Sequence, residues 1–168
     1  MGCAQLTQVT IAAAIVLVAA CQAETGSEQV PAADLELFRS EAYPVLMRDC
    51  GFNACHGVPE RFLIVFGPNR ARMDPATHHD TPVLPVELEV TYERARSMLL
   101  TDGPVTRSLL LTKPLETSAG GVSHGGVDDS NRNVYQSVED PGYLALLKWA
   151  QAVPMGAATP LPLPSPSP

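Results

Sequence analysis

Basic residues are in short supply in this 168-residue sequence, which has 11 Lys and Arg against 18 Asp and Glu and a formal net charge of −7. Nucleic acids bind basic protein surfaces, so this charge argues against a nucleic-acid partner. It permits electrostatic steering toward a basic partner protein, and it also favours solubility.

Aromatic residues and strand signals are also scarce. Phe, Trp and Tyr make up 5% of the residues, so a buried cofactor would supply apolar bulk that the side chains do not. The segment 63–66 is the one compact run of β-forming residues. No nucleophile with a base stands out, and we expect no enzyme. The pattern predicts a mainly α-helical protein.

The apolar run near the N-terminus is too short to cross a bilayer, which takes about 20 residues. Ile11 to Ala20 fits the apolar core of a signal peptide, although the leader lacks Lys and Arg. Its ending, Val18-Ala19-Ala20-Cys21, resembles the lipobox of bacterial lipoproteins, in which cleavage leaves Cys21 as a lipidated N-terminus. The resemblance implies export to the periplasmic side of the membrane, and Gln22 after the cysteine implies the outer membrane. A buried apolar helix is the alternative.

Four segments follow from these patterns. We expect a signal peptide over 1–20, a lipidated N-terminal tether over 21–33, a helical domain over 34–153, and a disordered tail over 154–168. The tail alternates Pro with Ser and Leu, which is typical of a polyproline linker.

Only two cysteines remain for the domain once Cys3 leaves with the leader and Cys21 takes lipid. Cys50 and Cys55 would lie in an oxidising compartment, where a disulfide between them is one possibility. The residue after Cys55 favours another interpretation.

The stretch Cys50-Gly51-Phe52-Asn53-Ala54-Cys55-His56 has the form C-x4-C-H, whose spacer is two residues longer than in the usual haem-attachment motif. In such motifs each thiol adds to a haem vinyl group and the histidine binds the iron. The longer spacer fits if the extra residues bulge outward, and it resembles sites in some multihaem cytochromes. A disulfide needs no histidine there, and a zinc site takes four ligands. The motif predicts one covalently attached haem c.

Helical spacing predicts where the domain's helices lie. The first is marked by Leu35, Phe38, Ala42, Val45 and Leu46. Asp34 is its predicted N-cap, and Pro44 should kink it or make its second half a separate turn. A second helix is expected over Val86 to Leu100, a short turn after Thr106 or Ser108, and a last helix from Asp140 and Pro141 to about Val153.

Three further segments carry a family resemblance: Ser108 to Leu115, Gly120 to Gly126, and the closing Leu147-Lys148-Trp149. With the haem motif, they resemble the cytochrome c-like domains of planctomycete and myxobacterial proteins, over roughly 35–152. Those domains usually keep the two-residue spacer. The resemblance implies a small cytochrome c-like helical domain around one haem.

His124, in the glycine-rich segment, is the candidate for the second axial ligand of the iron. Glycines on both sides give its backbone unusual freedom, and the family resemblance implies that it binds iron opposite His56. Taken alone, a glycine-flanked histidine is more often a solvated loop residue. The competing candidates are Met73, Met98, His78 and His79.

The expected function is electron transfer by a membrane-anchored monohaem cytochrome that exchanges electrons with redox partner proteins. Two alternatives stay open. One is a haem-based sensor or ligand-binding domain. The other is a lipoprotein without haem, stapled by a Cys50–Cys55 disulfide.

Overall fold

A computed structural model describes residues 33–77 and 81–152 of the chain. Within these residues the regular structure is helical, and strand pairing is limited to two isolated bridges, Phe66 with Ala71 and Leu115 with Tyr135. The prediction of a mainly α fold is confirmed. The leader, Cys21 and the Pro-rich tail lie outside the described residues. No helix of the described part is long and apolar enough to cross a membrane.

The first helical run leads directly into the predicted haem motif. Its four consecutive parts are α1 (Leu35–Leu37), η1 (Phe38–Ala42), α2 (Tyr43–Val45) and η2 (Leu46–Cys50). As predicted, Asp34 is the N-cap, and its carboxylate accepts a hydrogen bond of 2.7 Å from the Leu37 amide. The run ends at Cys50 itself.

The sequence predicts a kink or a separate turn at Pro44, but the four parts of the run follow one another without a gap from Leu35 to Cys50, so no separate turn forms. Proline has no N–H, and in an α-helix its ring would press on the carbonyl of Ser40, four residues earlier. Here η1 and η2 are π-helical, and the Tyr43 amide donates to the carbonyl of Phe38, five residues back. A π-turn is wider than an α-turn. The wider turn lets the helical path continue through Pro44.

The remaining helices lie close to their predicted positions, except for the short helix over 117–119, which the sequence did not predict. They are α3 (Pro85–Ser97), η3 (Val105–Arg107), α4 (Leu109–Thr112), η4 (Thr117–Ala119) and α5 (Pro141–Gln151). The helix expected over 86–100 ends at Ser97. Asp140 holds the predicted N-cap position of α5, but its carboxylate accepts from the amides of Gln136 and Ser137 instead of from the first turn.

An aromatic cluster of Phe38, Tyr92 and Trp149 joins the first helical run to α3 and α5. The ring centres of Trp149 and Phe38 lie 4.9 Å apart, and those of Phe38 and Tyr92 lie 5.4 Å apart. Trp149 is fully buried and donates its indole N–H to the carbonyl of Asp34 at 3.1 Å. Aromatic pairs at such distances stabilise the core beyond their buried area.

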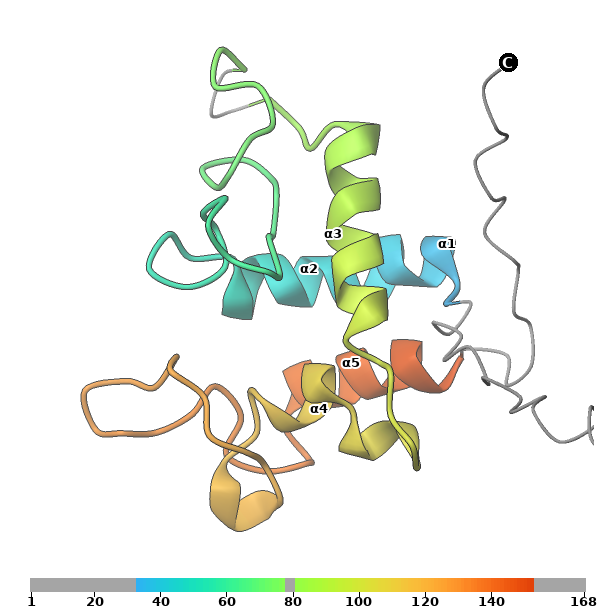
Figure 1. The fold of residues 1–168 in the computed structure, drawn as a ribbon, viewed down its shortest axis with the longest axis vertical. Helices are drawn as coiled ribbons and strands as arrows, with labels where there is room; N and C mark the ends of the chain where they lie inside the picture. The colour runs from blue at the N-terminus through green and yellow to red at the C-terminus, as the bar shows by residue number, and fades with distance from the viewer. Residues whose placement is uncertain (1–32, 78–80, 153–168) are drawn as a thin grey trace, which may run out of the picture.

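Two long loops extend from this core on the same side (Figure 1). The loop over residues 51–66 follows η2 and carries the haem motif. The loop over residues 120–135 precedes α5 and carries the glycine-rich segment. The helices therefore bring the two predicted ligand-bearing segments to one side of the molecule.

Candidate haem site

The haem-motif loop closes on itself through backbone hydrogen bonds. The amide of His56 donates to the carbonyl of Cys50 at 3.0 Å, and the amides of Cys55 and Gly57 donate to the carbonyl of Phe52 at 2.8 and 2.9 Å. Residues 52–54, which include the extra spacer residues, are exposed. The C-x4-C spacer thus forms a compact turn that points outward.

Gly57 makes this closure possible. A Cβ atom at position 57 would lie 2.2 Å from the carbonyl oxygen of Gly51, which no side chain can tolerate. The sequence gives no sign of this role for Gly57, because only the folded loop brings it against Gly51.

Both motif cysteines carry free thiols, so the structure holds no disulfide between them. Cys50 is buried at the end of η2. Burial, with smaller contributions from the charges of Asp49 and Cys55, raises the pKa of its thiol to about 12. Cys55 is half-buried and lines a cleft. Free thiols are what attachment to two vinyl groups requires.

His56 is held in one orientation by the loop that follows it. Its Nδ1 lies 2.9 Å from the carbonyl oxygen of Leu63. A carbonyl oxygen can only accept, so Nδ1 carries the ring proton and Nε2 keeps its lone pair. Burial is the main cause that lowers the pKa of His56, with the nearby rings and charges of His124 and Arg61 adding to it. The neutral ring is the form that binds metals.

His124 shows the same arrangement on the opposite loop. Its Nδ1 lies 3.1 Å from the side-chain oxygen of Asn133. As with His56, Nε2 has no hydrogen-bond partner among the described residues.

The two imidazole rings face each other as a pair. Their ring centres are 6.2 Å apart and their planes differ by 11°. An imidazole nitrogen lies about 2 Å from a bound metal ion and about 1 Å from its own ring centre, so two histidines on opposite sides of one ion have ring centres about 6 Å apart. The observed separation of the ring centres is close to that value.

The competing ligand candidates are not placed in this way. Met73 is 43% exposed, and its amide is bonded to Glu87. Met98 is partly buried against the core, as expected for a helical methionine. His78 and His79 lie outside the described residues. Among the candidate second ligands that the structure describes, His124 is the one that lies beside His56.

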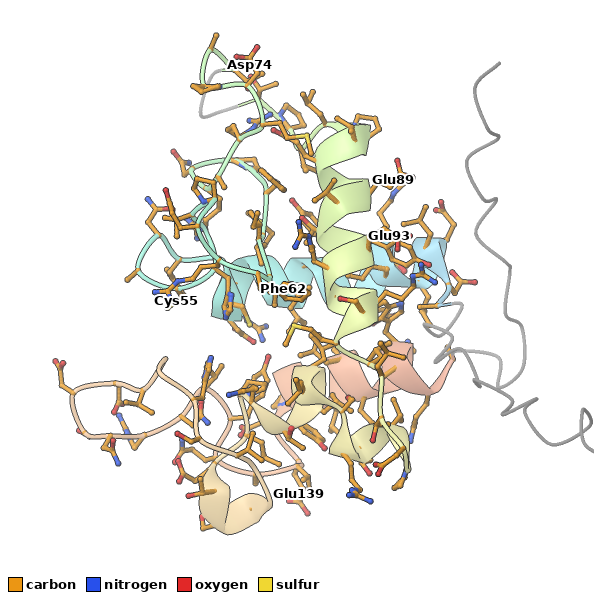
Figure 2. The ribbon with its side chains drawn as sticks, in the orientation of Figure 1. Cys55, Phe62, Asp74, Glu89, Glu93 and Glu139 are labelled. Atoms are coloured by element: carbon orange, nitrogen blue, oxygen red, sulfur yellow. The ribbon has the colours of Figure 1, made fainter. Side chains whose placement is uncertain are left out.

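An open cleft of about 940 Å³ lies between the two loops. Phe52, Ala54 and Cys55 line it from the haem-motif loop, and Gly125 and Gly126 line it from the other. Figure 2 shows Cys55 on the loop that borders this space. His56, His124 and Cys50 are not among the residues that line it, so this cleft borders the candidate site and does not by itself define it.

No group of three or more His, Cys, Asp or Glu suited to a metal ion occurs in the described part of the chain. Two imidazoles alone do not complete the coordination of iron. They are sufficient where a porphyrin supplies the other four nitrogens. Two imidazoles are therefore a donor set that a haem could use.

We found no matching protein-family model, no matching curated protein and no matching solved structure.

Proposed function

We propose that this chain is a monohaem c-type cytochrome that is exported, lipid-anchored through Cys21, and passes electrons between redox partner proteins. The observation that carries the proposal is the facing pair of His56 and His124, each with Nδ1 bonded to an oxygen and Nε2 free. The pair lies beside two free thiols in a C-x4-C-H motif. The resemblance to cytochrome c-like domains supports the same proposal.

Each residue has a defined part in holding the cofactor. The thiols of Cys50 and Cys55 would each add across one vinyl group, the sulfur bonding to one vinyl carbon and the hydrogen going to the other. His56 and His124 would bind the iron from opposite faces through Nε2. The haem supplies one-electron transfer through its iron. The carbonyl of Leu63 and the side chain of Asn133 would orient the two rings and place a proton on each Nδ1.

Two strong axial ligands favour an electron carrier over a ligand-binding haem protein. A sensor or an enzyme needs a position on the iron that an exogenous molecule can take, and His124 would occupy that position. Two imidazoles also give a lower reduction potential than a His/Met pair, because thioether ligation raises the potential.

The test is to make the full chain in a host with c-type haem maturation and to denature it. Haem should stay on the polypeptide through acid–acetone extraction, and Cys50→Ser with Cys55→Ser should release it. The spectrum of the oxidised protein should be low-spin and lack the near-infrared band of Met ligation. Wild-type protein without haem would contradict the proposal. Rapid binding of carbon monoxide by reduced wild-type protein would favour the ligand-binding alternative instead.

A further inference from the structure

We infer that Asn133 is a positioning residue that holds His124 in the Nδ1–H tautomer and so keeps its Nε2 lone pair available to a metal. The sequence offers no motif around Asn133, and the inference comes from the hydrogen bonds of its side chain. This inference extends the proposed function. It rests on that proposal only for the identity of the metal group, which is the haem.

The amide of Asn133 can adopt only one orientation. Its Nδ2 donates to the carbonyl oxygens of Lys113 and Leu115 at 2.8 and 2.9 Å. Its Oδ1 accepts from the amide of Val134 at 2.9 Å. Reversing the amide would place an oxygen against two carbonyl oxygens and an NH₂ group against an N–H. Three contacts therefore agree that oxygen faces His124.

This orientation decides the tautomer of His124. An amide oxygen only accepts, so the 3.1 Å contact with His124 requires a proton on Nδ1. Because a neutral imidazole carries one ring proton, Nε2 then has the lone pair. An unrestrained histidine side chain in water favours the opposite tautomer, with the proton on Nε2. Asn133 is 8% exposed, so water competes little for its oxygen.

Asn133 also ties the ligand-bearing loop to the end of α4. Both carbonyls that its Nδ2 binds belong to the segment directly after α4. The same segment holds the loop at a second place, because Lys113 donates its ammonium group to the carbonyl of Ser123 at 2.9 Å. The position of His124 is thus set by contacts on both sides of it in the loop.

A hydrogen bond to Nδ1–H makes an imidazole a stronger electron donor through Nε2, and residues that make such bonds tune the metal. Loss of the acceptor should therefore raise the reduction potential of a bound iron. A charged acceptor at the same place should lower it. A residue with a purely structural role would not change the reduction potential in opposite directions in the two variants.

The experiment uses the full chain with ¹⁵N-labelled histidine, purified from a host with c-type maturation, as wild type, Asn133→Ala and Asn133→Asp. Long-range ¹H–¹⁵N spectra of the imidazoles are recorded in the reduced state, with redox titrations beside them. Ser130→Ala, an exposed position in the same loop, is the control and should match wild type.

In haem-loaded protein the potential should rise in Asn133→Ala and fall in Asn133→Asp. Both variants remove the donor to the carbonyls of Lys113 and Leu115. If neither folds, the imidazole spectrum of the wild type made without haem decides, and His124 should carry its proton on Nδ1 there. If the purified chain holds no haem, the imidazole spectra alone decide, and His124 of the wild type should carry its proton on Nδ1. That outcome would contradict the proposed function while supporting the role of Asn133. A wild-type His124 protonated on Nε2, or unchanged potentials in both variants, would overturn the inference.

Discussion

Gly126 lies directly against the imidazole ring of His124. A Cβ atom at position 126 would come within 2.8 Å of Cε1 and within 3.4 Å of Nε2, the nitrogen proposed to bind iron. At the neighbouring Gly125 a Cβ would meet no atom within 4 Å. The two adjacent glycines therefore differ sharply in how a methyl group would affect the ring.

Gly126→Ala should push the His124 ring out of line with His56. In haem-loaded protein we expect a shift from low-spin toward high-spin iron and binding of carbon monoxide by the reduced form, both visible in absorption spectra. Ser130→Ala, an exposed change in the same loop that does not border the cleft, should keep the wild-type spectrum. Identical spectra for the two variants would argue against ligation by His124.

The two motif cysteines should differ in reactivity in the haem-free full chain. Burial raises the pKa of Cys50 to about 12, and the thiolate is the form that reacts with iodoacetamide. At pH 8 alkylation of Cys50 should be slower by a factor of about 100 or more in the folded chain than in denaturant, where its pKa returns to about 8.5. Peptide mass spectrometry follows each cysteine separately.

Cys55, which is half-buried and lines the cleft, serves as the internal comparison. It should be alkylated in the folded chain well before Cys50. Equal rates for the two cysteines in the native chain would mean that the end of η2 is not packed as described.

The positions of the helices followed from local patterns in the sequence. Apolar spacing and capping residues such as Asp34 and Pro141 act within a turn or two of the chain, so the sequence predicts them well. The path through Pro44 was not predictable in the same way. A proline can kink a helix or be absorbed by a wider turn, and local spacing does not distinguish the two outcomes.

The residues of the candidate site also differ in whether the sequence alone could identify them. The motif Cys50 to His56 is contiguous, so its chemistry could be read directly. The choice of His124 rested on a family resemblance, and its ligation stays a prediction. Asn133 and Gly57 were missed, because each matters through a contact that exists only after folding: the hydrogen bond to His124 and the close approach to Gly51.

The lipid anchor is tested by cell fractionation. Because Cys21 follows a lipobox-like sequence, the mature wild-type protein should be diacylated at Cys21 and should fractionate with membranes. Cys21→Ser should leave an unprocessed precursor or release a soluble form, and mass spectrometry of the N-terminal peptide distinguishes the two. Wild-type protein found wholly in the soluble periplasm would rule out the anchor.

A buried ion pair ties the loop before α3 to the first turn of that helix. The guanidinium Nε of Arg72 lies 3.0 Å from the carboxylate of Glu87, and the two side chains are 5% and 0% exposed. The carboxylate also accepts from the amides of Met73 and Leu84 at 2.9 and 3.0 Å. Removing one member of a buried pair costs about 3–5 kcal/mol, because the other charge is left unpaired. Glu87→Gln should therefore lower the free energy of unfolding by about 3 kcal/mol at pH 7.

The effect of Glu87 should depend on pH in a definite direction. Burial by itself would raise its pKa, but the hydrogen bonds from Arg72, Leu84 and Met73 outweigh it and lower the pKa in the folded state. A carboxylate with a lowered pKa stabilises the fold above its unfolded pKa of about 4.3, and this contribution disappears as the pH falls through the folded pKa.

Denaturant unfolding at a series of pH values should show wild type and Glu87→Gln differing most near neutral pH and converging in acid. Glu89→Gln, an exposed change on the same helix, should follow the wild type throughout. A gap between wild type and Glu87→Gln that stays constant down to pH 2 would show that the charge of Glu87 contributes nothing to the stability of the fold.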